Sequence, residues 1–163
     1  MTPECGVPQV LPDSAHLWRR VKDDKNHLMW DDESHRYIPA TAEALTFNPA
    51  LSTAWGEHVQ AHGEGPAALV ERAPQYRLVF SVQVAMVKKL RLVPEHDPER
   101  FPPDPPVSCA HVSVYWPESE PGDPRSPLHR SSRKALRFDL ASAVELIHGQ
   151  VHTEPPSSNI SNW

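Results

Sequence analysis

Two histidines of this chain have a spacing that suits a metal ion. His58 and His62 lie one helical turn apart in the segment NPALSTAWGEHVQAHGEG, residues 48–65, which we predict to be a short helix. Two imidazoles at this spacing can share one metal. The metalloprotease pattern also needs a glutamate directly after the first histidine, and Val59 stands there. The same spacing fits two structural histidines, so we predict no metal site and no cofactor, and name His58 and His62 as the candidate ligands.

A second group of polar side chains lies on the clearest predicted strand, residues 109–116. Alternation places Cys109, His111, Ser113 and Tyr115 on one face and Ala110, Val112, Val114 and Trp116 on the other. The polar face predicts a cleft beside His111, and Cys109 or His111 is the obvious third ligand for any metal. A direct pair of Cys109 with His111 is not expected, because two residues of strand advance the chain by about 6.6 Å.

Positive charge gathers in one segment near the C-terminus. Arg125, Arg130, Arg133, Lys134 and Arg137 fall within thirteen positions of a protein whose net charge is -5. Such a run is often only the solvated face of a helix. It also suits an acidic partner surface or a phosphate near the helix start. We predict that Arg130, Arg133 and Arg137 bind an acidic surface of a partner protein.

A third pattern joins an early arginine, a serine-threonine step and a glutamate. Arg19 or Arg20, then Ser52-Thr53, then Glu57 follow in an order similar to that of one class of nicotinamide-dependent ADP-ribosyl transferases. That class carries the arginine on an early strand and the serine-threonine step on a later strand. Here the predicted helix makes Ser52-Thr53 a helix cap. The resemblance implies a small enzyme in which Arg19 and Glu57 are candidate catalytic residues. His111 and His58 are further candidates, from the polar strand face and the helical pair.

The elements that position these residues are short and separated by prolines, of which there are nineteen. We predict strands at 16–21 and 76–84, the latter running into helical turns, and an extended proline-rich connector at 94–107. A helix begins at Ser131 or Ser132 and ends at Gly149. Together these predict an α+β fold, with a small mixed or antiparallel sheet and two or three helices packed on one face. We expect an extended lead-in (1–14), one domain (15–149) and a flexible tail (150–163).

Composition limits the classes of function. The net charge of -5 disfavours a binder of duplex nucleic acid, which must neutralise many phosphates. No apolar run approaches the roughly 20 residues that span a bilayer, and the N-terminus lacks the features of a secretory signal. The two cysteines, Cys5 and Cys109, do not suggest a disulfide framework. We therefore expect a cytoplasmic protein without a membrane or nucleic-acid partner.

From the sequence we favour a non-catalytic protein-interaction or accessory protein, because rigid connectors and scattered acid-base groups suit a binding surface. The alternative is the small enzyme with a cleft beside His111, either similar to ADP-ribosyl transferases or metal-dependent. The arrangement of Leu17 to Arg20, Leu51-Ser52, the block 84–93 and the His111 strand resembles small bacterial proteins. That resemblance implies a bacterial source and no particular activity.

Overall fold

The computed structural model describes residues 7–40, 43–47, 50–71, 73–98, 109–117 and 130–156, the last range without the side chains of residues 130 and 131. Its strands are β1 His16–Val21, β2 Leu28–Asp31, β3 Arg36–Pro39, β4 Leu51–Trp55, β5 Leu78–Gln83, β6 Val93–His96, β7 His111–Tyr115 and β8 Glu145–His148. Its helices are α1 Gly56–Ala61, α2 Ala68–Glu71, α3 Val84–Lys89 and α4 Arg130–Ala143.

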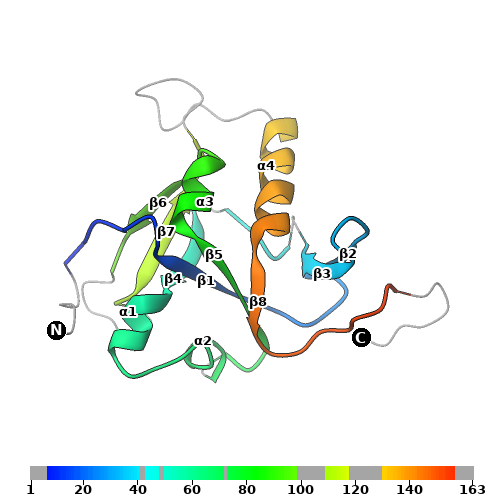
Figure 1. The fold of residues 1–163 in the computed structure, drawn as a ribbon, viewed down its shortest axis with the longest axis horizontal. Coiled ribbons are helices and arrows are strands. Elements are labelled where there is room, and N and C mark those ends of the chain that lie inside the picture. Colours follow the sequence, from blue (N-terminus) through cyan, green and yellow to red (C-terminus); the bar gives the residue numbers. More distant parts are fainter. Residues whose placement is uncertain are drawn as a thin grey trace.

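Six of these strands form one antiparallel sheet in the order β6-β7-β4-β1-β5-β8, and β2 pairs with β3 as a separate hairpin (Figure 1). The predicted α+β class is confirmed. Within the sheet β1 is central, and its six residues pair along their whole length with β5, from His16 opposite Gln83 to Val21 opposite Leu78.

Each face of the sheet is covered by its own helices. Leu17 and Val21 of β1 pack with Leu140 of α4 in the larger apolar cluster, which also includes residues of α3; we call this side the α4 face. Trp18 packs with Val59 of α1 in the smaller cluster, on what we call the α1 face. The predicted separation of Trp18 from Leu17 and Val21 is confirmed. The helices in the described part of the chain cover both faces, whereas the sequence predicted one.

Three predicted elements end or begin differently in the structure. The predicted helix at 48–65 starts with strand β4, and α1 follows from Gly56. The C-terminal helix ends at Ala143, after which β8 pairs with the open edge of β5, and Gly149 ends this strand at φ 88°. Strand β6 occupies the first part of the predicted connector, where it pairs with β7; residues 99–108 lie outside the described part. In each case the sheet supplies hydrogen-bond partners that local sequence does not reveal.

The described part of the lead-in is extended and packs on the domain. Leu11 is 7% exposed and belongs to the larger apolar cluster. The backbone N–H of Gln9 donates to Nδ1 of His96 at 3.0 Å, and Asp13 pairs with Lys88 of α3 at 2.8 Å. At the other end of the chain, Val151 packs against the larger cluster. The ordered domain thus includes contacts from residues that the sequence assigned to its two ends.

Candidate functional site

The sheet opens between its two central strands, β1 and β4. These strands pair at only two positions, Leu17 opposite Trp55 and Trp18 opposite Ala54. Beyond them Arg19 bridges the opening: its Nε–H donates to the carbonyl of Ala44 at 3.1 Å and its Nη1 to the carbonyl of Ser52 at 2.9 Å. A guanidinium group therefore lies where two adjacent strands have separated.

Ser52 and Thr53 lie on β4 beside this opening, which corrects their predicted role as helix caps. Neither caps α1, whose N-cap residue is Trp55 without a side-chain hydrogen bond. Thr53 faces the same side as Arg19, and its hydroxyl donates to the carbonyl of Val112 at 3.0 Å. Ser52 is exposed and holds Arg19 through its backbone carbonyl. The arginine and the serine-threonine step thus occupy neighbouring strands.

The charge of Arg19 has no carboxylate partner among the described residues. Burial of the guanidinium lowers the pKa of Arg19 from its usual value. The neighbouring Arg20 lies on the α1 face, where its Nη1 donates to the carbonyl of Leu69 at 3.2 Å and its guanidinium lies 4.7 Å from the ring centre of Tyr76. The two consecutive arginines therefore have different surroundings, and only Arg19 reaches the opening.

A small hollow of about 10 Å³ lies beneath Arg19, with room for about one water. Apolar side chains of β1, β4, β5 and α4 form most of its wall, among them Leu51, Phe80 and Leu140. A ligand larger than a water must therefore bind over the rim of this hollow, where Arg19 and α4 meet.

Helix α4 adds an arginine–tryptophan cluster on this face, formed by Arg133, Arg137, Trp116 and Phe47. The guanidinium carbons of Arg133 and Arg137 lie 5.8 and 5.4 Å from the ring centre of Trp116. Phe47 stacks on the same indole, with ring centres 3.9 Å apart and planes 21° from parallel. The Nε atoms of both arginines are buried and have no hydrogen-bond partner in the described structure. Arg125 and the side chain of Arg130 lie outside the described structure.

The sequence carried two signals of this cluster. Alternation along the His111 strand placed Trp116 on the apolar face with Val112 and Val114, and all three side chains contact the larger apolar cluster. Arg133 and Arg137 are one turn apart, so they share a helix face. Phe47 comes from a loop, and its stacking had no sequence signal.

Glu57 does not join Arg19, because the two side chains lie on opposite faces of the sheet. The Glu57 carboxylate accepts the backbone N–H of His16 at 3.0 Å and the Nδ1–H of the same residue at 2.6 Å. Both side chains line an open hollow of about 280 Å³ on the α1 face, together with Ser81 and Gln60. The sequence analysis missed His16, whose contact with Glu57 spans 41 positions.

His58 of α1 and His62, the C-cap residue of that helix, are stacked, and no third metal ligand joins them among the described residues. The rings of His58 and His62 have centres 5.1 Å apart and planes 20° from parallel. His58 is 1% exposed, and neither of its ring nitrogens has a hydrogen-bond partner in the described structure. Burial, followed by the nearby His96 and His62, lowers the pKa of His58. No three histidine, cysteine or acidic side chains in the described ranges are close enough to hold a metal.

The two residues proposed as a third ligand are engaged elsewhere. Cys109 is completely buried and disulfide-bonded, contrary to the expectation from two widely spaced cysteines, because separation along the chain does not limit a disulfide. Nδ1 of His111 donates to the carbonyl of Asp97 at 3.0 Å, and Ser113 Oγ donates to the Asp97 carboxylate at 3.2 Å. Asp97 thus lies against the polar face on which we predicted a cleft.

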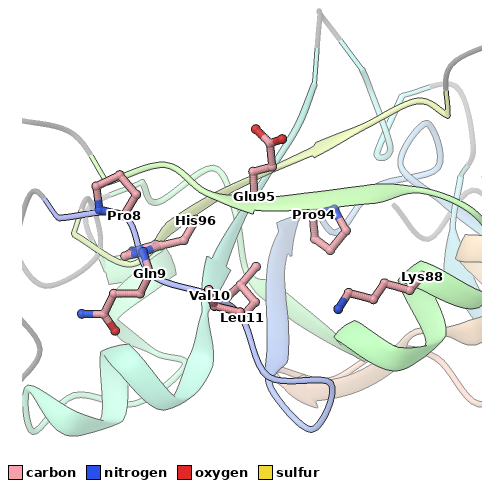
Figure 2. Close-up of a pocket in the computed structure, with 8 residues that line it drawn as sticks. All are labelled: Pro8, Gln9, Val10, Leu11, Lys88, Pro94, Glu95 and His96. Atoms are coloured by element: carbon pink, nitrogen blue, oxygen red, sulfur yellow. The ribbon is translucent and has the colours of Figure 1, made fainter. Parts of the chain in front are cut away.

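A larger open groove, of about 360 Å³, separates the lead-in from β6 and α3 (Figure 2). His96 forms its base: Nδ1 accepts the N–H of Gln9, and Nε2–H donates to the carbonyl of Cys109 at 2.8 Å. Lys88 reaches toward the groove from α3, while Glu95 projects from the other side of β6 (Figure 2). Because both His96 nitrogens are already engaged, the groove offers few free polar groups to a ligand.

Comparisons with known proteins add no relative. A scan against protein-family models and searches of curated proteins and of solved structures return no match. In the described part of the chain no helix has the length and apolar character needed to cross a membrane. The candidate site therefore depends on its own geometry, and its best-formed part is the opening between β1 and β4.

Proposed function

We propose that the protein binds a nicotinamide dinucleotide over the β1–β4 opening and is an enzyme similar to ADP-ribosyl transferases. One observation carries the proposal: Arg19 on β1 bridges to the Ser52-Thr53 step on the adjacent strand β4. The resemblance found in the sequence requires an arginine on an early strand and a serine-threonine step on a later strand. Both requirements are supported by these positions.

The chemistry of Arg19 suits the phosphates of such a ligand. Its guanidinium is planar, carries several N–H donors and stays charged at any physiological pH. Two of its donors hold backbone carbonyls, which fixes the group in place. With no carboxylate partner in the described residues, its charge is available to an anion.

The glutamate of the resemblance does not lie beside Arg19 in the structure. Glu57 holds His16 on the opposite face, so it does not serve Arg19. The described residues around Arg19 that line the hollow with it are apolar, except for Thr53. Arg19 therefore supports dinucleotide binding, whereas transfer of the ADP-ribosyl group needs an acid or base from elsewhere in the chain.

Adjacent arginines provide the test. NAD⁺ is titrated into the wild type, Arg19→Gln and Arg20→Gln by calorimetry, and nicotinamide release is followed by chromatography. We expect Arg19→Gln to weaken binding at least about tenfold, or about 1.4 kcal/mol, and Arg20→Gln to stay within about twofold. Equal affinities of the two variants, or no binding by the wild type, would reject the site. Binding without nicotinamide release would reject the enzyme.

A second proposal keeps the function favoured by the sequence, an accessory protein of a bacterial-type cytoplasm that docks an acidic partner through Arg130, Arg133 and Arg137. The observation that favours it is that Arg133 and Arg137 have no carboxylate partner in the described structure and are held on Trp116. Arginine and tryptophan are enriched where interfaces bind most strongly.

The test of this proposal is the recovery of partners from native lysate by the wild type and by a variant with glutamate at these three positions. We expect the variant to lose an acidic partner that also dissociates from the wild type at high salt. Equal recovery would exclude the cluster from the interface. Arg19→Gln should recover the partner normally, which distinguishes the two proposals.

A further inference from the structure

The arginine–tryptophan cluster places two like charges on one aromatic ring. Arg133 and Arg137 both lie within 6 Å of the Trp116 ring centre, at 5.8 and 5.4 Å, which is the range of a cation–π contact. These contacts orient the two guanidinium groups but leave their mutual repulsion in place. Phe47 lies against the same indole and so limits how the ring can move.

Nothing in the described structure balances this charge. Neither arginine has an ion pair or a hydrogen bond to a described residue, and both Nε atoms are shielded from solvent without an acceptor. Asp139 is the only acidic residue of α4, and it lies two residues from Arg137, which places it on a different side of the helix. A buried N–H of a charged group without an acceptor is costly, and native proteins rarely retain one.

We infer that Arg133 and Arg137, held on Trp116, bind a phosphate group. The planar fork of a guanidinium matches two phosphate oxygens, and two such forks from adjacent turns can hold one tetrahedral anion. An anion there can accept hydrogen bonds from the terminal N–H groups of both guanidinium ions, and it offsets the repulsion between the two cations. Lys134, between them in sequence, is exposed and points elsewhere on the helix, so it is not part of this site.

The position of the cluster connects it to the opening between β1 and β4. Arg137 precedes Leu140 by three residues, about 4.5 Å along the helix axis, and Leu140 lines the hollow beneath Arg19. The cluster and the hollow therefore lie on neighbouring turns of α4, and a ligand with two phosphate groups is the class that we propose to join the cluster to Arg19. This extension to a diphosphate rests on the proposed dinucleotide function; the phosphate site itself does not.

The test uses inorganic pyrophosphate, which lacks the nucleoside parts of a dinucleotide. It is titrated at low salt into the wild type, Arg133→Gln/Arg137→Gln and Lys134→Gln, with melting temperatures measured to show that each variant is folded. We expect the double variant to bind at least about tenfold more weakly and Lys134→Gln to bind within about twofold of the wild type. The same titration should change the tryptophan fluorescence of the wild type but much less that of Trp116→Phe.

Each outcome decides the inference. Equal pyrophosphate affinity of the double variant and Lys134→Gln overturns the phosphate site. A wild type that binds no pyrophosphate, but binds an acidic protein through Arg133 and Arg137, overturns it as well. Pyrophosphate binding that depends on Arg133 and Arg137, in a protein that binds no NAD⁺, supports the phosphate site and rejects the dinucleotide. Loss of pyrophosphate binding in Arg19→Gln as well would support one continuous site.

Discussion

The two faces of the sheet differ in the partners that surround their titratable side chains. On the α1 face, the Glu57 carboxylate accepts hydrogen bonds from both the backbone and the ring of His16. His58 is buried there, and burial favours the uncharged form of its ring. On the α4 face, Arg19, Arg133 and Arg137 contact carbonyls or an indole and have no carboxylate partner among described residues. The Glu57–His16 pair serves the architecture, whereas the clustered cations of the α4 face suit a ligand. Arg20 on the α1 face also contacts a carbonyl and an aromatic ring, but its side chain is exposed.

The largest effect is expected where the lead-in completes the α4 face. Leu11→Ala should lower the free energy of unfolding by about 3 kcal/mol, because a leucine that is 7% exposed leaves a cavity when it is truncated. Val10→Ala is the matched control, because Val10 is adjacent to Leu11 in sequence but is 92% exposed. This substitution should change the free energy of unfolding by less than about 0.5 kcal/mol. Urea unfolding measures both. Equal losses would show that the lead-in does not belong to the core.

On the α1 face, Gly56→Ala should cost about 2 kcal/mol. A Cβ at Gly56 would lie 2.4 Å from the indole of Trp18, which is itself buried, so the ring or the helix must move. Gly65→Ala is the control, because a Cβ there meets no atom within 4 Å. If Gly65→Ala is as destabilising as Gly56→Ala, then helix α1 does not pack on Trp18 as closely as the structure indicates.

Acid should weaken the α1 face through His58. Burial lowers the folded-state pKa of His58 below the value of 6.5 expected in the unfolded chain, so the unfolded state binds more protons below that pH. The contribution of His58 is therefore complete above about pH 6.5 and is lost as the pH falls, by at most about 1.4 kcal/mol per pH unit. Stability is measured from pH 7.5 to 5 for the wild type and His58→Phe. A variant with the same acid slope as the wild type would exclude His58 as the cause.

Sequence periodicity predicted the strands that carry their own pattern. Alternation was sufficient for β1 and β7, and it assigned Trp18 and Trp116 to their faces. It was wrong for Ala110, directly before β7, which it grouped with Val112 but which belongs to the smaller cluster. It failed at residues 51–55 and 145–148, where the chain is a strand because β7 and β5 supply the hydrogen bonds. Local propensity does not contain such distant partners.

The candidate site was predictable only in part for the same reason. The sequence contained Arg19 and Ser52-Thr53, but it did not reveal that β1 pairs with β4, which makes them neighbours, or that the pairing stops after two positions. It grouped Glu57 with Arg19, since no pattern showed that a strand end and the first turn of α1 would direct Glu57 to His16. Arg133 and Arg137 were predicted as part of a positively charged segment. Their contacts with Trp116, and the stacking of Phe47 on that ring, were seen only in the tertiary structure.

The smallest effect is expected from two exposed carboxylate contacts, Glu57 with His16 and Asp13 with Lys88. Glu57→Gln should cost about 0.5 kcal/mol, because the side chains of His16 and Glu57 are 45% and 43% exposed and water screens their attraction. Glutamine keeps one oxygen as an acceptor for the His16 N–H, which limits the loss further. Asp13→Asn removes the more exposed pair with Lys88, whose side chains are 50% and 70% exposed, and should cost no more. Thermal melting in low and high salt measures both variants, and added salt should reduce each difference from the wild type. A loss above about 2 kcal/mol for Glu57→Gln alone would mean that the Glu57 carboxylate is essential to the folding of the α1 face. The structural role of this pair would then be larger than its exposure predicts, and the difference from the unpaired arginines described on the α4 face would be greater.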